Sequence, residues 1–232
     1  MPETSGNLLL AALPPAVRRP CVDAGERVSV RAGEEIVTQG DRSRHAFFPT
    51  SAVCSLTMGL KSGDKAECAS VGAEGMVGLA LLTGAPRSPF SAIVQIAAAG
   101  YRVPLATLAE LLQDHAPLRE AMLTYTGFAL SVVGRAMACD SYHSIAERLA
   151  RWLLMTRDRA GADRFKLTQD FIAQMLAIRR QSVTVAARAL QKAGLIRYAH
   201  GDIAILDGEA LEESSCTCYQ AVRREFERLL QP

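Results

Sequence analysis

Two neighbouring stretches between residues 168 and 194 carry hydrophobic residues at the spacing of an α-helix. Their apolar positions are Phe171, Ile172, Met175 and Leu176 in the first stretch, then Val183, Ala186, Ala187 and Leu190 in the second. Thr168 is suited to cap the free amides of the first helix, and Gly194 stands where the second would end. The pattern therefore predicts two helices joined by a tight turn.

Two short β-forming runs follow, at residues 196–198 and 203–206, with His200, Gly201 and Asp202 favouring a turn between them. Two helices and a hairpin in this order are typical of a winged helix-turn-helix, whose second helix reads DNA bases with its first residues. Arginine suits guanine, glutamine suits adenine, and a serine hydroxyl suits a phosphate. The expected DNA-contacting residues are Thr168, Arg179, Arg180, Gln181, Ser182, Thr184, Arg188 and His200.

Charge supports the DNA-binding interpretation. Residues 163–200 hold seven lysines and arginines against two aspartates, a net charge of +5, whereas the whole chain carries +2. The positive field is therefore concentrated on the segment that would face phosphate. The alternative is that these arginines form an ordinary solvated helix face.

Residues 27–104 show a different pattern, in which short β-rich runs alternate with glycine-containing turns. This pattern predicts a small β-sandwich or β-barrel. Within it lies a glycine-rich loop at residues 71–79, followed by an arginine. Because such loops offer free amides to phosphate, we expect a candidate anion site formed by Gly75, Met76, Gly78, Arg87 and Ser88. The alternative is a structural role for Arg87 and a pocket filled by its own side chains.

A long apolar helix is predicted next, over residues 118–139. Apolar side chains recur there at alternating spacings of four and three, and we expect the positions Leu118, Met122, Tyr125, Ala129, Val132 and Ala136 to form a homodimer interface. A DNA-reading helix usually needs a symmetric pair to cover two half-sites. The alternative is a lone core helix.

The remaining elements give a provisional division of the chain. Ser144 is suited to cap a helix over residues 145–157, residues 211–230 are expected to form one amphipathic helix, and residues 7–13 a short helix on the first domain. The predicted domains are a β-roll sensor (1–115), a dimerisation helix with its hinge (116–143) and a DNA-binding domain (144–232).

Composition narrows the function classes. The first apolar run has no basic segment before it and is cut by Pro14 and Pro15, so neither a signal peptide nor a membrane span is expected, and the protein is placed in the cytoplasm. No nucleophile–base pair or nucleotide-triphosphate loop is visible, so no catalytic residues are expected. Cys216 and Cys218 lack a second cysteine pair or a nearby histidine in the sequence, so no metal site is predicted.

The order of these parts resembles the Crp/Fnr family of bacterial transcription regulators. The segments that carry the resemblance are RAGEEIVTQGD, VGAEGMVGL, AERLARWLL and LTQDFIAQMLAIRRQSVTVAARALQKAGLI. The resemblance implies an α+β fold with a cyclic-nucleotide-binding-type β-roll, a long dimerisation helix and a C-terminal winged helix-turn-helix domain. It also implies a homodimer on double-stranded DNA, with RNA polymerase as a further partner and a small effector in the β-roll.

At several positions this chain departs from the family pattern, and these departures limit which family properties can be expected of it. Where members that bind cyclic AMP carry Gly-Glu-Leu before Arg-Ser, this chain has Gly75, Met76 and Val77. The carboxylate for the ribose is missing, so cyclic AMP is not expected as an effector. Oxygen-sensing members have several cysteines near the N-terminus, and here only Cys21 lies there, so no iron–sulfur cluster and no other definite cofactor are expected.

Arg180 stands where the family has a base-reading arginine, while Gln181 replaces its glutamate and Val185 a second arginine. A different operator is therefore expected, read by a recognition helix over residues 180–193. Two functions remain: a homodimeric DNA-binding regulator, and a cyclic-nucleotide-binding-like module that controls another protein. The positive charge of residues 163–200 favours the first.

Overall fold

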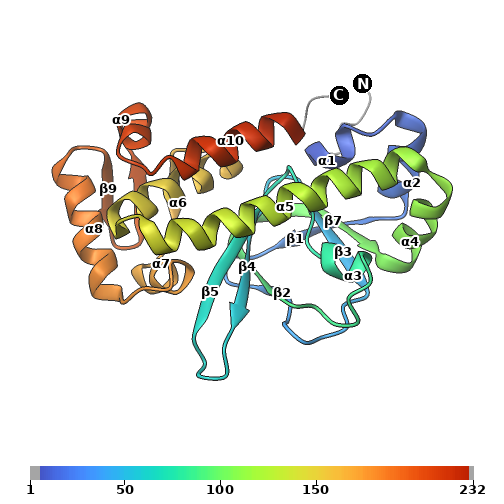
Figure 1. The fold of residues 1–232 in the computed structure, drawn as a ribbon. Helices are drawn as coiled ribbons and strands as arrows, with labels where there is room; N and C mark the ends of the chain where they lie inside the picture. Colours follow the sequence, from blue (N-terminus) through green and yellow to red (C-terminus); the bar gives the residue numbers. More distant parts are fainter. Residues whose placement is uncertain (1–5, 230–232) are drawn as a thin grey trace.

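The structure, a computed structural model, describes residues 6–229 and consists of two lobes joined by one long helix (Figure 1). The helices of the first lobe are α1 (Leu8–Ala11), α2 (Pro15–Asp23), α3 (Leu79–Leu82) and α4 (Leu105–Asp114). Its strands are β1 (Glu26–Val30), β2 (Glu35–Val37), β3 (His45–Pro49), β4 (Val53–Gly59), β5 (Lys65–Val71), β6 (Ser91–Ile96) and β7 (Ala98–Pro104). The connecting helix is α5 (Ala116–Tyr142).

The second lobe is mostly helical. Its elements are α6 (Ile145–Ala160), β8 (Arg164–Lys166), α7 (Gln169–Met175), α8 (Arg180–Lys192), β9 (Ile196–Ala199), β10 (Asp202–Ile205), α9 (Gly208–Glu213) and α10 (Cys218–Leu229). The predicted α+β arrangement of a β-roll, a long helix and a winged helix-turn-helix is confirmed.

The β-roll of the first lobe consists of two antiparallel sheets, ordered β1-β7-β3 and β2-β6-β4-β5. Alternate side chains of both sheets, among them Phe47, Cys54 and Val94, form a shared core. Gly100 pairs with Pro49 in this roll, and a Cβ at Gly100 would overlap the ring of Phe47. This close approach requires a glycine.

Short helices close one end of the roll. The predicted helix near the N-terminus is confirmed as α1: the side chain of Asn7 accepts a hydrogen bond from the Leu10 amide at 3.0 Å and donates to the carbonyls of Pro49 and Gly75. Helices α2 and α4 were not predicted. Helix α2 begins at a proline and α4 directly after one. The fixed φ of proline suits the first turn of a helix, but a proline in the sequence indicates a loop equally well.

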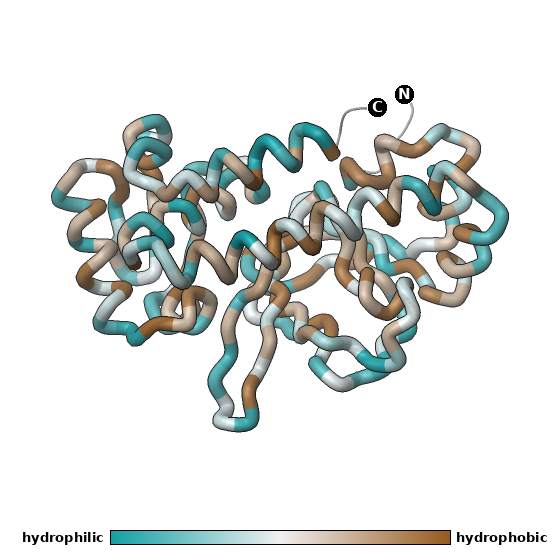
Figure 2. Tube along the Cα trace, viewed as in Figure 1, coloured by the Kyte–Doolittle hydropathy of each residue, from teal (hydrophilic) through white to brown (hydrophobic). Residues whose placement is uncertain are grey.

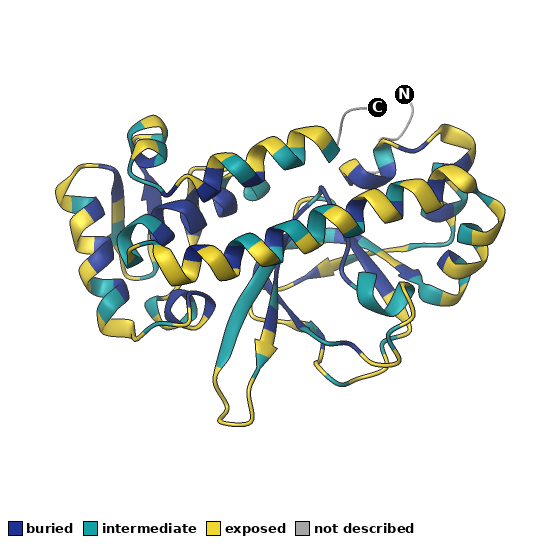
Figure 3. Cartoon of the chain, in the orientation of Figure 1, coloured by how far each residue is buried: buried dark blue, intermediate teal, exposed yellow. Residues whose placement is uncertain are grey.

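Helix α5 uses the predicted heptad positions inside its own chain. Leu118, Met122, Tyr125, Val132 and Ala136 are buried against the two lobes, and Ala129 is half-buried. For five of the six residues the assignment to a dimer interface is therefore corrected, because the protomer already covers their side chains; Ala129 is only partly covered. Apolar residues nevertheless recur along the helix (Figure 2), and exposed positions recur along it as well (Figure 3). Leu123, Leu130 and Met137 are both apolar and exposed.

The second lobe contains the expected helices and one strand that was not expected. Ser144 and Glu147 form a reciprocal capping box at the start of α6, and α7 and α8 follow as predicted. Strand β8 pairs with β10, which makes a three-stranded sheet of the predicted hairpin. β8 is only three residues long, and its Arg-Phe-Lys sequence offers a single apolar position.

The C-terminal segment was predicted as one helix and forms two. Its expected last residue, Leu230, lies outside the described residues. Helix α9 is capped by Asp207 and ends at Glu213, after which α10 begins at Cys218 and packs along α5 and α6. The break directs Cys216 and Cys218 into the interior, where both are buried.

Three side-chain pairs join the first lobe to α6. Trp152 Nε1 donates to Glu67 Oε1 at 3.0 Å, and Gln95 Nε2 donates to Thr156 Oγ1 at 2.6 Å. The third pair is a buried ion pair between Arg159 and Glu74, 2.6 Å apart. These contacts pair polar groups of the first lobe with side chains of α6 among the described residues.

Candidate nucleic-acid interface and sensor pocket

Helix α8 divides its residues between a buried and an exposed face. Val183, Ala186, Ala187 and Leu190 are buried in the core of the second lobe. On the other face, Arg180, Gln181 and Arg188 are exposed, as is Arg179 just before the helix, while Ser182 and Thr184 are half-buried. The arginines and the glutamine expected to contact DNA therefore project from one end and one side of a rigidly packed helix.

The turn before α8 fixes the angle between the two helices. Ala177 adopts φ 52°, a left-handed conformation that ends α7 within the predicted turn. Thr168 caps α7, since its hydroxyl accepts from the Phe171 amide at 3.2 Å. Thr184 donates to Gln169 Oε1 at 3.0 Å, which ties α8 to α7.

Arg180 lies near one acidic neighbour. Its Nε is 3.5 Å from Asp170 Oδ1, and both side chains are largely exposed. Exposed ion pairs of this kind contribute little to the stability of the fold and are screened by salt. The guanidinium of Arg180 can therefore exchange Asp170 for a base or a phosphate.

The hairpin beside α8 has the form of a wing. His200 and Gly201 form its two-residue turn with φ values of 52° and 83°, and the His200 side chain is exposed there. Tyr198 anchors the strand by donating its hydroxyl to the Leu167 carbonyl at 2.8 Å, and burial raises the pKa of this phenol to about 12. The wing is therefore held against the helix pair at neutral pH.

The five residues of the predicted anion site do not all line one pocket. Met76 is 1% exposed in the core, and its amide is hydrogen-bonded to the Tyr125 hydroxyl at 3.1 Å. Gly75 is pressed against the same hydroxyl. Arg87 donates instead to the Gly40 carbonyl at 2.8 Å, and the Ser88 hydroxyl donates to the Phe90 carbonyl at 2.6 Å.

A cavity of about 280 Å³ nevertheless lies between the β-roll and α5. Met76, Gly78 and Ser88 of the predicted site line it, whereas Gly75 and Arg87 do not. Most of its other lining residues are apolar, including Leu56, Leu81, Phe90, Phe128 and Ala129. A pocket of this character suits an apolar guest better than a phosphate.

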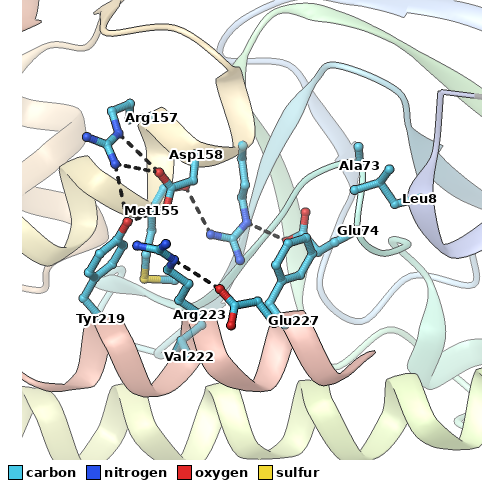
Figure 4. A pocket seen from close by; sticks show the side chains of 12 residues that line it. Leu8, Ala73, Glu74, Met155, Arg157, Asp158, Tyr219, Val222, Arg223 and Glu227 are labelled. Carbon is cyan, nitrogen blue, oxygen red and sulfur yellow. Dashed lines mark hydrogen bonds and ion pairs between the residues drawn. The ribbon is translucent and has the colours of Figure 1, made fainter. Parts of the chain in front are cut away.

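A second cavity, of about 440 Å³, lies where the first lobe, α6 and α10 meet. Figure 4 shows Tyr219 of α10 facing Arg157 and Asp158 of α6. The Tyr219 hydroxyl donates to Asp158 at 2.7 Å, and burial together with this bond raises the pKa of Tyr219 to about 12. This polar wall secures the C-terminal helix and lies apart from α8.

Four potential metal-ligating side chains come together in the fold, although the sequence predicted no metal site. Cys139, His143, Cys216 and Cys218 come together with all their candidate ligand atoms within 4.8 Å of one another. Sequence reasoning missed the set because Cys139 and Cys216 are separated by 77 positions. The local signals were the pair Cys216 and Cys218 and the spacing of four between Cys139 at the end of α5 and His143 at its cap.

Comparison with known proteins agrees with this architecture. Residues 27–115 match the model of the cyclic nucleotide-binding domain, and residues 147–214 match that of the Crp-like helix-turn-helix domain. Between them the two models cover more than half of the chain. No curated protein matches the sequence.

Solved structures share the fold at low identity. FixK2 from Bradyrhizobium japonicum is 18% identical with a TM-score of 0.71, and the match covers 83% of this chain and 98% of that one. A CRP-family transcriptional regulator from Thermus thermophilus is 20% identical with a TM-score of 0.67, covering 82% and 96%. The c-di-GMP-responsive regulator CLP from Xanthomonas campestris is 13% identical with a TM-score of 0.69, covering 83% and 99%.

Proposed function

This chain belongs to the Crp/Fnr family of transcription regulators, and from that membership we propose that it binds a two-fold-related operator through α8. Members of this family bind DNA as dimers and are not enzymes. The observation that carries the proposal is the exposed row formed by Arg179, Arg180, Gln181 and Arg188 on a helix whose other face is buried. A module that controls another protein would not need this row at the N-terminal end of α8.

Salt dependence of DNA binding tests this proposal. Each arginine that neutralises a phosphate releases a counterion, so the logarithm of the affinity should fall linearly with the logarithm of the salt concentration. A gel shift with duplex DNA should therefore weaken steeply as salt rises. The Arg188→Ala variant should show a shallower slope, and Arg19→Ala, which alters an exposed arginine on α2, should match the wild type. The absence of any shift at low salt would favour the protein-controlling module.

We further propose that the dimer forms through the outward face of α5. Leu123, Leu130 and Met137 recur there every seven residues and are 71%, 73% and 71% exposed. Gly127 and Gly134 lie between them with no heavy atom within 4 Å of a Cβ placed on either. The alternating spacings of four and three are those of a coiled-coil seam, and the glycines allow a close approach of two backbones.

The apolar surface of α5 supports the same assignment. By length and composition this helix could cross a membrane, yet only 22% of its most apolar stretch is buried within the chain. A second copy packed along Leu123, Leu130 and Met137 would remove these side chains from water. Two recognition helices would then face one operator from a symmetric pair.

For the first lobe we propose an apolar small-molecule effector in the 280 Å³ cavity. Thr126, Ala129, Leu130 and Val133 of α5 line this cavity, so an occupant would contact the same helix that is proposed for dimerisation, including Leu130 of the outward seam. Differential binding to two arrangements of α5 is the physical requirement for such an effector to regulate DNA binding. We propose that cyclic AMP is not this effector.

Two finer assignments rest on family membership. Crp/Fnr regulators are typically cytoplasmic, and we propose the same location for this protein together with RNA polymerase as its partner at promoters. We also propose the division into a sensor (1–115), a dimerisation helix with hinge (116–143) and a DNA-binding domain (144–232), whose outermost residues lie beyond the described range.

A further inference from the structure

We propose that Cys139, His143, Cys216 and Cys218 bind one zinc ion that fastens the C-terminal helices to the hinge between α5 and α6. The placement of the four residues is the first support. Cys139 and His143 lie one helical turn apart at the end of α5 and its cap, and Cys216 and Cys218 flank the start of α10. Side chains distant in the sequence thus meet at the point where the two lobes join.

Distances within the set match a single tetrahedral ion. The Sγ atoms of Cys139 and Cys216 are 3.4 Å apart, and Cys218 Sγ is 3.8 Å from His143 Nδ1. Around zinc, with Zn–S of about 2.3 Å and Zn–N of about 2.0 Å, tetrahedral geometry places two sulfurs about 3.8 Å apart and a sulfur and nitrogen about 3.5 Å apart. Small side-chain adjustments would therefore suffice.

The chemistry of the donors selects the metal. Three thiols and one imidazole suit zinc and exclude calcium and magnesium, which prefer oxygen ligands. An iron–sulfur cluster distributes its four protein ligands over two or more iron atoms and so needs a wider set. Here every ligand atom lies within 4.8 Å of all the others, which favours one ion.

Burial and charge around the set agree with a closed structural site. Cys139, Cys216 and Cys218 form their own buried cluster, with exposures of 0%, 3% and 5%, and the half-buried His143 completes the rim. Arg151 is also buried, acts electrostatically on Cys139 and Cys216, and has an Nε without a hydrogen-bond partner within residues 6–229. Three thiolates around Zn²⁺ leave one negative charge, which this guanidinium would offset.

Metal content of the full-length protein tests the proposal. Protein purified under reducing conditions and dialysed against zinc, then against metal-free buffer, should retain one zinc per chain by elemental mass spectrometry. Cys216→Ser and Cys218→Ser should lose it, whereas Cys68→Ser, on β5 and outside the set, should retain it. Cobalt loaded in place of zinc should show the visible absorption of a tetrahedral thiolate site in the wild type and in Cys68→Ser only.

Other outcomes would overturn the proposal. These are wild-type protein that retains no zinc, zinc retained by both serine variants, iron and sulfide in place of zinc, or a Cys139–Cys216 disulfide in the reduced preparation. If a serine variant does not fold by circular dichroism, His143→Ala at the half-buried rim replaces it and should weaken zinc binding in competition with a coloured chelator. None of these readouts involves DNA, so this proposal and the proposed function fail independently.

Discussion

At the scale of single residues, the junction between the lobes contains polar groups that have few hydrogen-bond partners. Glu67 accepts from Trp152 through Oε1, while its Oε2 is buried without a hydrogen-bond partner among the described residues. Burial raises the pKa of this carboxyl above its ordinary value, against the opposing effects of the hydrogen bond from Trp152 and the charges of Arg151 and Arg159. The ionised form therefore has an energetic cost in the folded protein.

Glu67→Gln should remove that cost while keeping an acceptor for Trp152. Because the folded wild type binds its proton more tightly than the unfolded chain, its stability falls as pH rises from about 4.3, the unfolded pKa, through the raised pKa. The variant should therefore melt at a higher temperature than the wild type at neutral pH. The difference should vanish below about pH 4. Glu120→Gln, on an exposed position of α5, is the matched control, and a lower melting temperature of Glu67→Gln at pH 7 would show that ionisation of Glu67 stabilises the junction.

The prediction about cyclic AMP depends on Met76. Its side chain is buried and offers no carboxylate for a ribose hydroxyl, and Arg87 is bonded to Gly40 outside the cavity lining. Loss of a hydrogen bond to a charged partner costs about 1.5–3 kcal/mol, or roughly tenfold or more in affinity. Calorimetric titration of the purified protein should show weak binding of cyclic AMP or none, and micromolar binding that also enhances operator affinity would contradict this.

At the scale of elements, α5 shows what a hydrophobic pattern determines and what it leaves open. Two sets of residues on this helix follow a heptad spacing: one runs from Leu118 to Ala136, and the other consists of Leu123, Leu130 and Met137. The first set contains more apolar side chains. Sequence reasoning assigned the richer seam to the dimer, but the fold places it against the β-roll and leaves Leu123, Leu130 and Met137 exposed. The spacing predicts a seam, and only the position of the β-roll decides which seam is inside the protomer.

Leu130→Glu tests the outward seam. In a symmetric dimer the two carboxylates would meet at the interface, and leaving charges buried and unpaired costs about 3–5 kcal/mol. Sedimentation should therefore show monomers at concentrations where the wild type is a dimer, with a loss of operator binding. Leu60→Glu is the control, since Leu60 is 65% exposed in the loop between β4 and β5. An unchanged Leu130→Glu dimer would place the interface on another surface.

At the scale of the whole molecule, local patterns predicted more than long-range proximity. The caps at Thr168 and Ser144, the α7–α8 pair and the wing follow from hydrogen-bonding groups and periodicities within a few residues. The cluster of Cys139, His143, Cys216 and Cys218 depends instead on how α10 folds back along α5, which no local pattern encodes. For the same reason the glycine-rich loop suggested an anion site, whereas Tyr125 and neighbouring backbone groups occupy amides of that loop.

At the scale of the whole molecule, we propose that α8 is the element that reads DNA bases. Arg180 and Gln181 lie exposed at the start of α8, and a dimer formed through α5 would present two such helices to one duplex. Half-sites should then be separated by about one helical turn, roughly 34 Å, or a multiple of it.

Binding-site selection from random duplex DNA, with the wild type and Arg180→Ala in parallel, tests the central claim most directly. The wild type should enrich a two-fold-related motif, and Arg180→Ala should lose about 1–3 kcal/mol and relax the base preference at one position of each half-site. Arg188→Ala should weaken binding to all sequences and leave the motif intact. Selection of an unchanged motif by Arg180→Ala, or of no motif by the wild type, would contradict the assignment of α8 as the element that reads the operator.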